Sequence, residues 1–425
     1  FYSPCEILKA QKEKGVSWDI EGAVDESKIQ PVIDRFYGVC LGVAAALVDE
    51  GVASIEDTDR GAKIGLRWVM GPFEIMNRIG IEKTCAAVEA VARKYPDFRM
   101  PDILIRQKAA GKPFEFTFVD LDVKDGIAFI TLNRPEAMNA LNEAVVAQLS
   151  ARFTAAEQDP AVKAIVFQGA GKAFVAGADI RYFVNKIKAG RVSDIVDFTR
   201  KGHALLLKIE TASKPTIALL DGLSLGGGSE LALACQAIVA TPAGSLGFPE
   251  TGIGIYPGLG GMLRLARHVG PELAKYYAFS GVTISAEDAH ALGIVNRLVA
   301  PAEVDAAIKE LVEKGKPDKY RRREFPAKFK PLAAMGSAAN VSNLLAGRPP
   351  EGVDQALAAK TAKIVGYKAP LALKIADEII DQQIDKPMEE AVEIELGRLQ
   401  EIFSTADALE GLTSMGRKRP TYKGA

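Results

Sequence analysis

The stretch LGGGSELALAC, at residues 225–235, decides the fold of this chain, together with GSLGFPETGIGIYPGLGG at residues 244–261. Both place a glutamate, Glu230 or Glu250, beside glycine-dense turns in strongly apolar surroundings. The three glycines 226–228 follow a predicted strand and precede a predicted helix, so backbone N–H groups point outward at the helix start. The start of a helix stabilises negative charge. The two stretches therefore combine an anion-binding turn with two acids.

A second turn of the same kind lies in GKAFVAGADIRYF, where Gly177, Ala178 and Asp179 separate a strand from the next predicted helix. If the two turns converge, their N–H groups meet the requirement of a thioester oxyanion. The simpler interpretation is a set of tight turns, with Asp179 as an N-cap and Glu230 as a helix-surface acid. Taken one turn at a time, the residues leave both interpretations open.

Working outward, strand and helix patterns alternate through the second part of the chain. FTFVDLDV and GIAFITLN alternate apolar and polar residues on either side of Lys124, Asp125 and Gly126, which predicts a hairpin. Helical and strand patterns then follow in turn as far as QAIVAT at 236–241. This order predicts an α/β layer structure.

The first part of the chain has a helical period from Ile29 to about Arg106, with a helix end at Gly51, a cap at Ser54 and a restart at Pro72. The polar linker RQKAAGKPFE follows. Residues 314–364 are basic and rich in Pro and Gly, and are interpreted as an insertion whose KYRRR run forms a solvated face.

Composition narrows the function classes. The 425 residues carry 53 basic and 54 acidic side chains, a net charge of -1, and this balance predicts neither nucleic acid nor a membrane surface as partner. Apolar runs such as VCLGVAAALV end after about ten residues, short of the ~20 of a membrane span. The four cysteines lack CxxC spacing, which indicates thiols in a reducing, cytoplasmic setting and no metal site.

Other catalytic patterns are missing from the sequence. No dinucleotide fingerprint, P-loop or GxSxG elbow is present. The three histidines, His203, His268 and His290, lie on helical patterns or after RLAR, where surface or packing roles are expected.

Taken together, these stretches resemble the crotonase (enoyl-CoA hydratase/isomerase) superfamily from about Phe114 to the end. ITLNRPEAMNAL looks like its first CoA-contacting turn, KAFVAGADI and LDGLSLGGGSELALAC like its two oxyanion loops, and LGFPETGIGIYPGLGG like the segment with the second acid. PLALKIADEII and ADALEGLTSMGRKRPTYKG are similar to its C-terminal helices and tail. The resemblance implies the α/β ββα-superhelix fold of that superfamily.

The resemblance also implies roles for single residues. The N–H groups of Ala178 and Gly227 are expected to bind the thioester oxygen, and Glu230 and Glu250 to flank one water molecule. A pair of acids in a dry site is expected to divide into one acid and one base, but the sequence does not say which is which.

CoA contacts follow from the same resemblance. Ala137 and Ala176 are expected to contact CoA through their backbones, and Asp179 to support its loop. Glu136 departs from the family pattern, in which a lysine is common, so a phosphate contact is in doubt; Arg134, Arg181 or a basic residue of 319–330 could replace it.

The segment from Ile33 to Gly80, with MGPFE at 70–74, resembles the helical C-terminal domain of 3-hydroxyacyl-CoA dehydrogenases, although Asp34 and Asn77 depart from the residues expected there. The expected domains are therefore 1–28 as the tail of a missing upstream Rossmann module, 29–112 as an all-α dehydrogenase-like domain, and 113–425 as the crotonase domain. The catalytic His–Glu pair and the NAD of such dehydrogenases belong to that missing module.

The function implied is hydration of short-chain trans-2-enoyl-CoA to 3-hydroxyacyl-CoA, without a metal or redox cofactor, within a protein that in full length also carries dehydrogenase activity. The open alternatives are an enoyl-CoA isomerase, another crotonase reaction, or a noncatalytic acyl-CoA-binding module. The resemblance further implies a homo-oligomer based on trimers or dimers.

Overall fold

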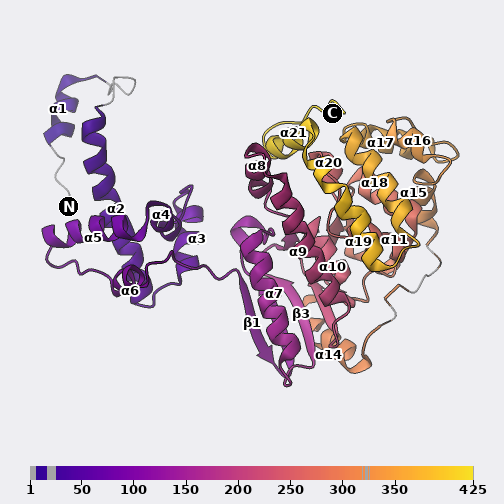
Figure 1. Ribbon diagram of the computed structural model, residues 1–425, viewed down its shortest axis with the longest axis horizontal. Helices are drawn as coiled ribbons and strands as arrows, with labels where there is room; N and C mark the ends of the chain where they lie inside the picture. The colour runs from indigo at the N-terminus through magenta and orange to yellow at the C-terminus, as the bar shows by residue number, and fades with distance from the viewer. Residues whose placement is uncertain (1–5, 17–24, 318, 321–323, 325, 425) are drawn as a thin grey trace. The chain divides into compact units, whose positions relative to one another are not determined.

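The structure is a computed structural model that describes residues 6–16, 25–317, 319–320, 324 and 326–424. The chain divides into two compact units, Phe1–Phe116 and Thr117–Ala425, which are described separately (Figure 1). Cys5 and residues 321–323 lie outside the described part, as do residues 1–5 and 17–24 of the predicted 1–28 tail. The described cysteines, Cys40, Cys85 and Cys235, are free thiols.

The described part of the first unit is helical throughout. Its helices are α1 (Glu6–Lys14), α2 (Glu26–Asp49), α3 (Ile55–Gly65), α4 (Pro72–Ile79), α5 (Ile81–Lys94) and α6 (Asp102–Ala110). A small apolar core joins α2, α4, α5 and α6 through Leu41, Phe73, Val88 and Leu104. The all-α prediction for this region is confirmed.

Local sequence signals set the helix boundaries of this unit. Ser54 Oγ accepts a 3.0 Å hydrogen bond from the N–H of Asp57 and so caps α3, as predicted. Pro72 occupies the first turn of α4, and Gly51 has a φ of 69° just beyond α2. Asn77 exchanges two hydrogen bonds with the backbone of Phe114 and thereby holds the linker against this unit.

Helix α2 begins at Glu26, ahead of the predicted start of the helical period at Ile29. Its Ser27–Asp49 segment is the one helix in the described ranges that is long and apolar enough to cross a membrane, with 28% of its apolar window buried. Length and composition are weak evidence here, because the core helix of a soluble protein meets the same test. Leu41, Ala44 and Ala45 of this helix are core residues of the unit.

The second unit is built on two sheets. Its strands are β1 (Val119–Lys124), β2 (Ile127–Leu132), β3 (Ala164–Gly169), β4 (Ala173–Ala176), β5 (Thr216–Leu220), β6 (Leu223–Leu225), β7 (Ala237–Ala240), β8 (Ser245–Gly247), β9 (Ile284–Ser285) and β10 (Arg297–Leu298). The larger sheet has the order β1-β2-β3-β5-β7-β10, parallel except for the β1–β2 hairpin, and the smaller has the order β4-β6-β8-β9.

The predicted hairpin and strand–helix alternation are present. Asp125 and Gly126 both have positive φ, 55° and 76°, which is the backbone of the two-residue turn that suits twisted antiparallel strands. The helices of this unit are α7 (Glu143–Gln158), α8 (Ile180–Lys188), α9 (Val192–Glu210), α10 (Gly227–Ala234), α11 (Gly261–Val269), α12 (Pro271–Ser280), α13 (Ala286–Ala291), α14 (Val304–Lys314), α15 (Lys330–Met335), α16 (Val341–Leu345), α17 (Gln355–Val365), α18 (Pro370–Gln383), α19 (Met388–Gly397), α20 (Leu399–Phe403) and α21 (Ala406–Ser414). Short 3-10 turns are η1 (Pro135–Ala137), η2 (Glu250–Ile253), η3 (Pro301–Glu303) and η4 (Ala327–Phe329).

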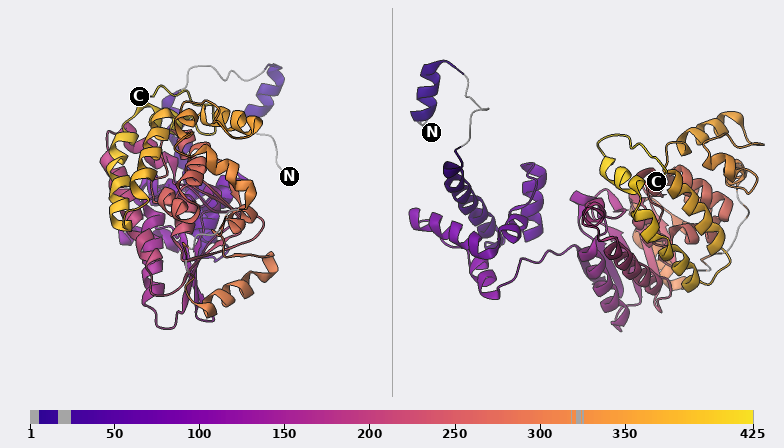
Figure 2. Two further views of the ribbon diagram at one scale, coloured as in Figure 1. Left: turned by 90° about the vertical axis from the view of Figure 1, so that its right-hand side faces the viewer. Right: turned by 45° about the horizontal axis from the view of Figure 1, so that its top comes forward.

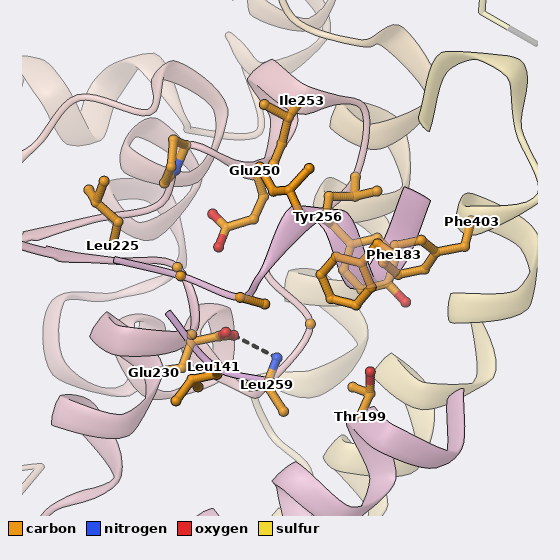
Figure 3. Close-up of a pocket in the computed structure, with 18 of the residues that line it drawn as sticks. Leu141, Phe183, Thr199, Leu225, Glu230, Glu250, Ile253, Tyr256, Leu259 and Phe403 are labelled. Carbon is orange, nitrogen blue, oxygen red and sulfur yellow. Dashed lines mark hydrogen bonds between the residues drawn. The ribbon is translucent and has the colours of Figure 1, made fainter. Parts of the chain in front are cut away.

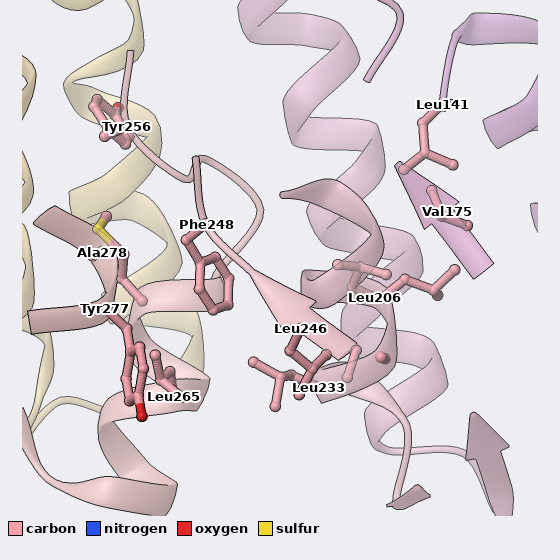
Figure 4. Close-up of a cluster of buried hydrophobic side chains, with 14 of the residues drawn as sticks. Leu141, Val175, Leu206, Leu233, Leu246, Phe248, Tyr256, Leu265, Tyr277 and Ala278 are labelled. Carbon is pink, nitrogen blue, oxygen red and sulfur yellow. The ribbon is translucent and has the colours of Figure 1, made fainter. Parts of the chain in front are cut away.

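Both faces of the larger sheet are covered. One face joins α7, α9 and α10 in the main apolar core, which continues through Leu246 and Phe248 to the helices that follow (Figure 4). The other face packs Val166, Ile217 and Val239 against Ile308 and Leu311 of α14. Figure 2 gives two further views of the ribbon. Strands buried on both faces read as continuous apolar runs, which is why the sequence predicts them well.

Residues 314–364 are not a simple solvated excursion. They form η4, α15, α16 and most of α17, and the side chain of Lys319 is 12% exposed because it pairs with Glu210 at 2.8 Å. Tyr320 donates to the same carboxylate. Burial lowers the pKa of Lys319 to about 8. The expectation that KYRRR forms a solvated face is therefore wrong for Lys319, since Glu210 draws this lysine into the fold.

Candidate active site

A cavity of about 200 Å³ lies between the ends of β4 and β6 of the smaller sheet and the helices α8, α9, α10 and α20 (Figure 3). Most of its wall is apolar or backbone. The residues that line it are Leu141, Ala176, Gly177, Ala178, Ile180, Phe183, Phe198, Thr199, Leu225, Gly226, Gly227, Glu230, Pro249, Glu250, Ile253, Ile255, Tyr256, Gly258, Leu259, Leu399, Phe403 and Met415. Glu230 and Glu250 are the only carboxyl groups in this lining.

The two predicted amide turns come together at this cavity. The loop from Gly177 to Asp179 follows β4, and Gly226 precedes α10. A Cβ atom built on Gly226 would stand 3.7 Å from the Cα of Gly177, so the two turns lie close together.

The amides that face the cavity are not used within the fold. Leu141 accepts from the N–H of Asp179 and donates to the carbonyl of Gly177, which leaves the N–H of Ala178 between them. Gly227 is the first residue of α10, where amides have no helical partner. In the part of the chain that the structure describes, neither N–H has a hydrogen-bond partner. Both amides thus remain available to an anionic oxygen.

Glu230 lies in the first turn of α10 and is 2% exposed. Its Oε1 accepts hydrogen bonds from the N–H groups of Leu259, at 2.7 Å, and Gly261, at 2.9 Å. The alternative of a helix-surface acid is wrong, because α10 is buried on all sides. These donors hold the carboxyl group in one place at the cavity wall.

Glu250 begins η2 and is 8% exposed. Its Oε1 lies against Gly226, and its Oε2 has no hydrogen-bond partner among the described residues. Figure 3 shows the carboxyl groups of Glu230 and Glu250 at one end of the cavity, with Phe183, Tyr256 and Phe403 toward the other. The arrangement puts both acids within one apolar space.

Burial dominates the electrostatics of this pair. It raises the pKa of Glu230 well above its ordinary value, with further contributions from the charges of Glu250 and Glu395, while the two N–H donors act in the opposite direction. Burial also raises the pKa of Glu250, to about 8, and the positive charge of Lys368 opposes this shift. With its pKa at about 8, the Glu250 carboxyl group retains its proton at neutral pH.

The residues expected to contact CoA differ in whether they line the cavity and in how exposed they are. Ala176 lines the cavity, whereas Ala137 ends η1 outside its lining. Asp179 caps α8 and accepts a 3.1 Å hydrogen bond from Arg134. The side chain of Arg134 is 13% exposed and that of Arg181 is 78% exposed. Of the two arginines, Arg181 is thus the more accessible to a phosphate.

The sequence analysis did not identify two buried residues beside the site, Glu395 and His203. Glu395 is fully buried on α19 and accepts a 2.7 Å hydrogen bond from the N–H of Gly260, inside the turn that holds Glu230. The sequence MEEAVEIELGRLQEIFS predicts a helix there without singling out Glu395, although an acid between apolar positions was a signal. His203, expected to be a surface or packing residue, is buried with its Nε2 3.1 Å from Glu395 Oε1.

A metal centre is not part of the described site. Across the described residues no group of three or more His, Cys, Asp or Glu side chains is placed to hold a metal ion. The ring of His268 lies 5.0 Å from that of Tyr320 at an interplanar angle of 59°, and burial lowers the pKa of His268 to about 3.

Comparison with known proteins agrees with this geometry. Residues 127–422 match the family model described as enoyl-CoA hydratase/isomerase, and residues 32–113 match that of the 3-hydroxyacyl-CoA dehydrogenase C-terminal domain. A short-chain-enoyl-CoA hydratase of Clostridium acetobutylicum is 30% identical over 306 residues, covering 72% of this chain and 97% of that protein. A crotonyl-CoA hydratase of Syntrophomonas wolfei is 38% identical over 192 residues, covering 45% and 72%.

A solved structure shares the fold of the second unit. The crystal structure of an enoyl-CoA hydratase from Rhodobacter sphaeroides has a TM-score of 0.63 and 26% identity, and the match covers 72% of this chain and 93% of that one. The crotonase-type α/β fold and its helical N-terminal unit, both expected from the sequence, are thereby confirmed. The chain belongs to the enoyl-CoA hydratase/isomerase family and carries a 3-hydroxyacyl-CoA dehydrogenase C-terminal domain ahead of its crotonase unit.

Proposed function

We propose that the chain hydrates short trans-2-enoyl-CoA thioesters to 3-hydroxyacyl-CoA. The observation that carries the proposal is the placement of Glu230 and Glu250 in one apolar cavity with the amides of Ala178 and Gly227. A family member that catalyses hydration needs an acid, a base and an oxyanion site together. The names of the two hydratase relatives support the same reaction.

In the proposed mechanism, the thioester oxygen accepts hydrogen bonds from the N–H groups of Ala178 and Gly227. These donors stabilise the negative charge that develops on this oxygen as water adds to C3. They cost no reorganisation, because the β4 and β6 strands already hold both turns in place. The enoyl C2=C3 bond would lie between the two carboxyl groups.

The hydrogen bonds divide the two acids into a base and an acid. Glu230 accepts from Leu259 and Gly261, and donors of this kind favour a carboxylate. Glu250 Oε2 has no partner in the described part of the chain, which suits a protonated carboxyl group. We assign Glu230 as the base that takes a proton from water and Glu250 as the acid that protonates C2. The proton on Glu230 then returns to Glu250, which completes the cycle.

The aromatic end of the cavity supports short acyl chains. Phe183 and Phe403 lie with ring centroids 5.1 Å apart, and Phe183 and Phe198 6.4 Å apart. The hydroxyl of Tyr256 is engaged by the carbonyl of Glu395, so the tyrosine offers the cavity an apolar face. An acyl tail of a few carbons fills this space, while longer tails meet the aromatic rings.

The decisive experiment incubates the chain with crotonyl-CoA and follows loss of the conjugated thioester absorbance, with Glu250→Gln beside it. We expect fast loss in the parent and ~10²–10⁴-fold slower loss in the variant. Oxygen-18 from labelled water should enter at C3. A shifted double bond without label would favour an isomerase, release of free CoA thiol another crotonase reaction, and binding without any product a noncatalytic module.

We further propose that the helical unit serves a 3-hydroxyacyl-CoA dehydrogenase step, because hydration yields the substrate class that this domain's family name states. The first unit contains no histidine, so we expect no NAD reduction from the two units by themselves. Adding NAD and crotonyl-CoA to the purified chain tests this.

We also propose that the chain forms a homo-oligomer and is located in the cytoplasm. Light scattering coupled to size exclusion tests the oligomeric state, and fluorescent tagging tests the location.

A further inference from the structure

A third buried carboxyl group stands behind the catalytic pair without lining the cavity. Glu395, on α19, is completely buried, and its Oε1 accepts the N–H of Gly260 at 2.7 Å. Its backbone carbonyl accepts the hydroxyl of Tyr256 at 2.7 Å. Both contacts fall in the 256–261 segment, whose residues line the cavity from Tyr256 to Leu259 apart from Pro257.

Two carboxyl groups share the amides of this one turn. Glu230 Oε1 takes the N–H groups of Leu259 and Gly261, and Glu395 Oε1 takes the intervening N–H of Gly260. Gly260 has a φ of 82°, and a Cβ atom there would stand 2.3 Å from Nη1 of Arg264. The turn therefore has little freedom, and a shift at Gly260 moves the two donors that hold Glu230.

His203 occupies the other side of Glu395. It lies on α9 with 2% exposure, and its Nε2 is 3.1 Å from Glu395 Oε1. Within the described residues neither ring nitrogen meets the geometry of a hydrogen bond, so the contact with Glu395 is that of a close, poorly aligned pair. The same helix supplies Phe198 and Thr199 to the cavity wall.

Other polar groups around Glu395 are already engaged. Arg264, from α11, is bound to Glu210 and to the carbonyl of Leu259. The Nε2 of Gln383, from α18, donates to the carbonyl of Ala391 at 2.6 Å and to Glu395 Oε2 at 3.4 Å. Arg398, next along the chain, pairs with Glu378 and Glu401. His203 is thus the group beside Glu395 that has no other polar partner in the described structure.

The charge of Glu395 affects the pKa values of both Glu230 and Glu250. It contributes to the raised pKa values of Glu230 and of Glu250, while Lys368 acts on Glu250 in the opposite sense. Replacing the carboxylate by a neutral group of the same shape should lower both pKa values. A group that merely filled space would leave them unchanged.

We propose that Glu395, partnered by His203, is a positioning residue that fixes the Leu259–Gly261 turn and, through it, the carboxyl group of Glu230. A buried ionisable pair is costly compared with apolar packing, and such pairs fit a role in fixing one arrangement. The inference rests on the proposed hydration. Glu395 touches no substrate atom, so its effect should fall on turnover rather than on binding.

The test compares Glu395→Gln, Glu395→Leu and His203→Gln with the control Glu393→Gln. Glu393 is on the same helix, and its side chain is 62% exposed in an ion pair with Arg200. Steady-state hydration of crotonyl-CoA is measured across pH, and butyryl-CoA binding gives affinity independently. Near-ultraviolet circular dichroism confirms that each variant is folded.

For Glu395→Leu we expect kcat to fall at least ~10-fold while KM and butyryl-CoA affinity stay within ~2-fold, because the turn loses its central acceptor. For Glu395→Gln the fall should be smaller, because the amide oxygen can still accept from Gly260, but the basic limb of the pH profile should move to lower pH. His203→Gln should lower kcat without changing affinity. Glu393→Gln should match the parent.

Two outcomes separate the inference from the function on which it rests. If the parent hydrates crotonyl-CoA and the Glu395 variants keep its kcat and pH profile, the positioning role is wrong and the hydratase assignment stands. If the parent itself does not hydrate crotonyl-CoA, both are wrong. Should Glu395→Leu fail to fold, the pH profile of Glu395→Gln decides the matter by itself.

Discussion

Glu250 and Gly226 are in direct contact: a Cβ atom on Gly226 would stand 2.1 Å from Oε1 of Glu250. The proposed acid thus rests against the turn that presents the proposed oxyanion donor, and the position of one depends on the other. Gly226 also has a φ of 48°, which favours glycine. Because Gly226 has no side chain, it can adopt this positive φ and leaves room for the carboxyl group of Glu250.

Replacing Gly226 by alanine should therefore displace Glu250. We expect kcat for crotonyl-CoA hydration to fall ~10²-fold, since a displacement of about 1 Å can have this effect. Gly190→Ala is the matched control, because Gly190 has a φ of 67° and open space around its Cβ position. Both variants should lose ~1–3 kcal/mol of stability through backbone strain. Equal activity in the two would show that contact with Glu250 is unimportant.

Substituting Glu230 and Glu250 one at a time should show what each carboxyl group contributes to kcat. Glu230→Gln and Glu250→Gln should each lower kcat by ~10²–10⁴-fold, because each removes one proton transfer. If the residues act as a unit, the double variant should be scarcely slower than the worse single variant. Kinetics of the three proteins at one pH, with butyryl-CoA binding as a check on the site, measure this. Fully multiplicative losses would indicate independent roles.

The pH dependence of kcat/KM for hydration should reveal the pKa of Glu250, the proposed acid. Burial holds the pKa of Glu250 at about 8, so its proton is lost as the pH rises through 8, and kcat/KM should fall there. The charge of Lys368 lowers this pKa, so Lys368→Met should move the basic limb to higher pH. Lys363→Met, at an exposed site on α17, serves as the control. A limb that moves downward in Lys368→Met would contradict the assignment of Glu250 as the acid.

Much of this arrangement follows from local sequence signals, and the reasons are physical. The hairpin at Asp125 and Gly126, the buried parallel strands and the cap at Ser54 depend on residues close in sequence. Glu230 and Glu250 stand out because acids are rare in such apolar surroundings. The very short strands β6, β8 and β9 have too few residues for a period, so the second sheet was not predicted.

The parts that the sequence did not predict depend on distant contacts. Glu395 contacts Gly260 and His203 only after α9, α11 and α19 pack. The sequence of α19 by itself does not reveal either partner. Lys319 belongs to a run that looks solvated, yet Glu210 draws it inside. Burial of a charge is decided by its tertiary partner, which a local pattern does not contain.

The aromatic end of the cavity should set the acyl length. Phe403→Ala removes a ring that lies 5.1 Å from that of Phe183, so kcat/KM for octenoyl-CoA should rise relative to crotonyl-CoA. Met415 also lines the cavity but is 58% exposed, and Met415→Ala should leave the ratio unchanged. Competing the two substrates in one reaction gives the ratio directly. A ratio altered equally by both variants would place the acyl tail elsewhere.

In the helical unit, Asp59 should control the stability of helix α4. Its carboxyl oxygens accept the N–H groups of Phe73, at 2.7 Å, and Glu74, at 2.9 Å, from a position that is 1% exposed. Asp59→Ala leaves these amides without their acceptors and should cost ~1–3 kcal/mol. Asp57→Ala, at an exposed site, is the control and should cost less. Hydrogen exchange of residues 59–80 in the full chain measures both.

The same aspartate should make this region sensitive to pH. Burial raises the pKa of Asp59 from 3.8 to about 6, so the folded unit binds this proton more tightly than the unfolded chain does. Its contribution is fully present below about pH 4 and is lost as the pH rises through 6. Exchange protection of residues 59–80, corrected for intrinsic rates, should therefore decline between these values in the parent and not in Asp59→Ala. A decline of the same size in both proteins would assign the pH dependence to another group.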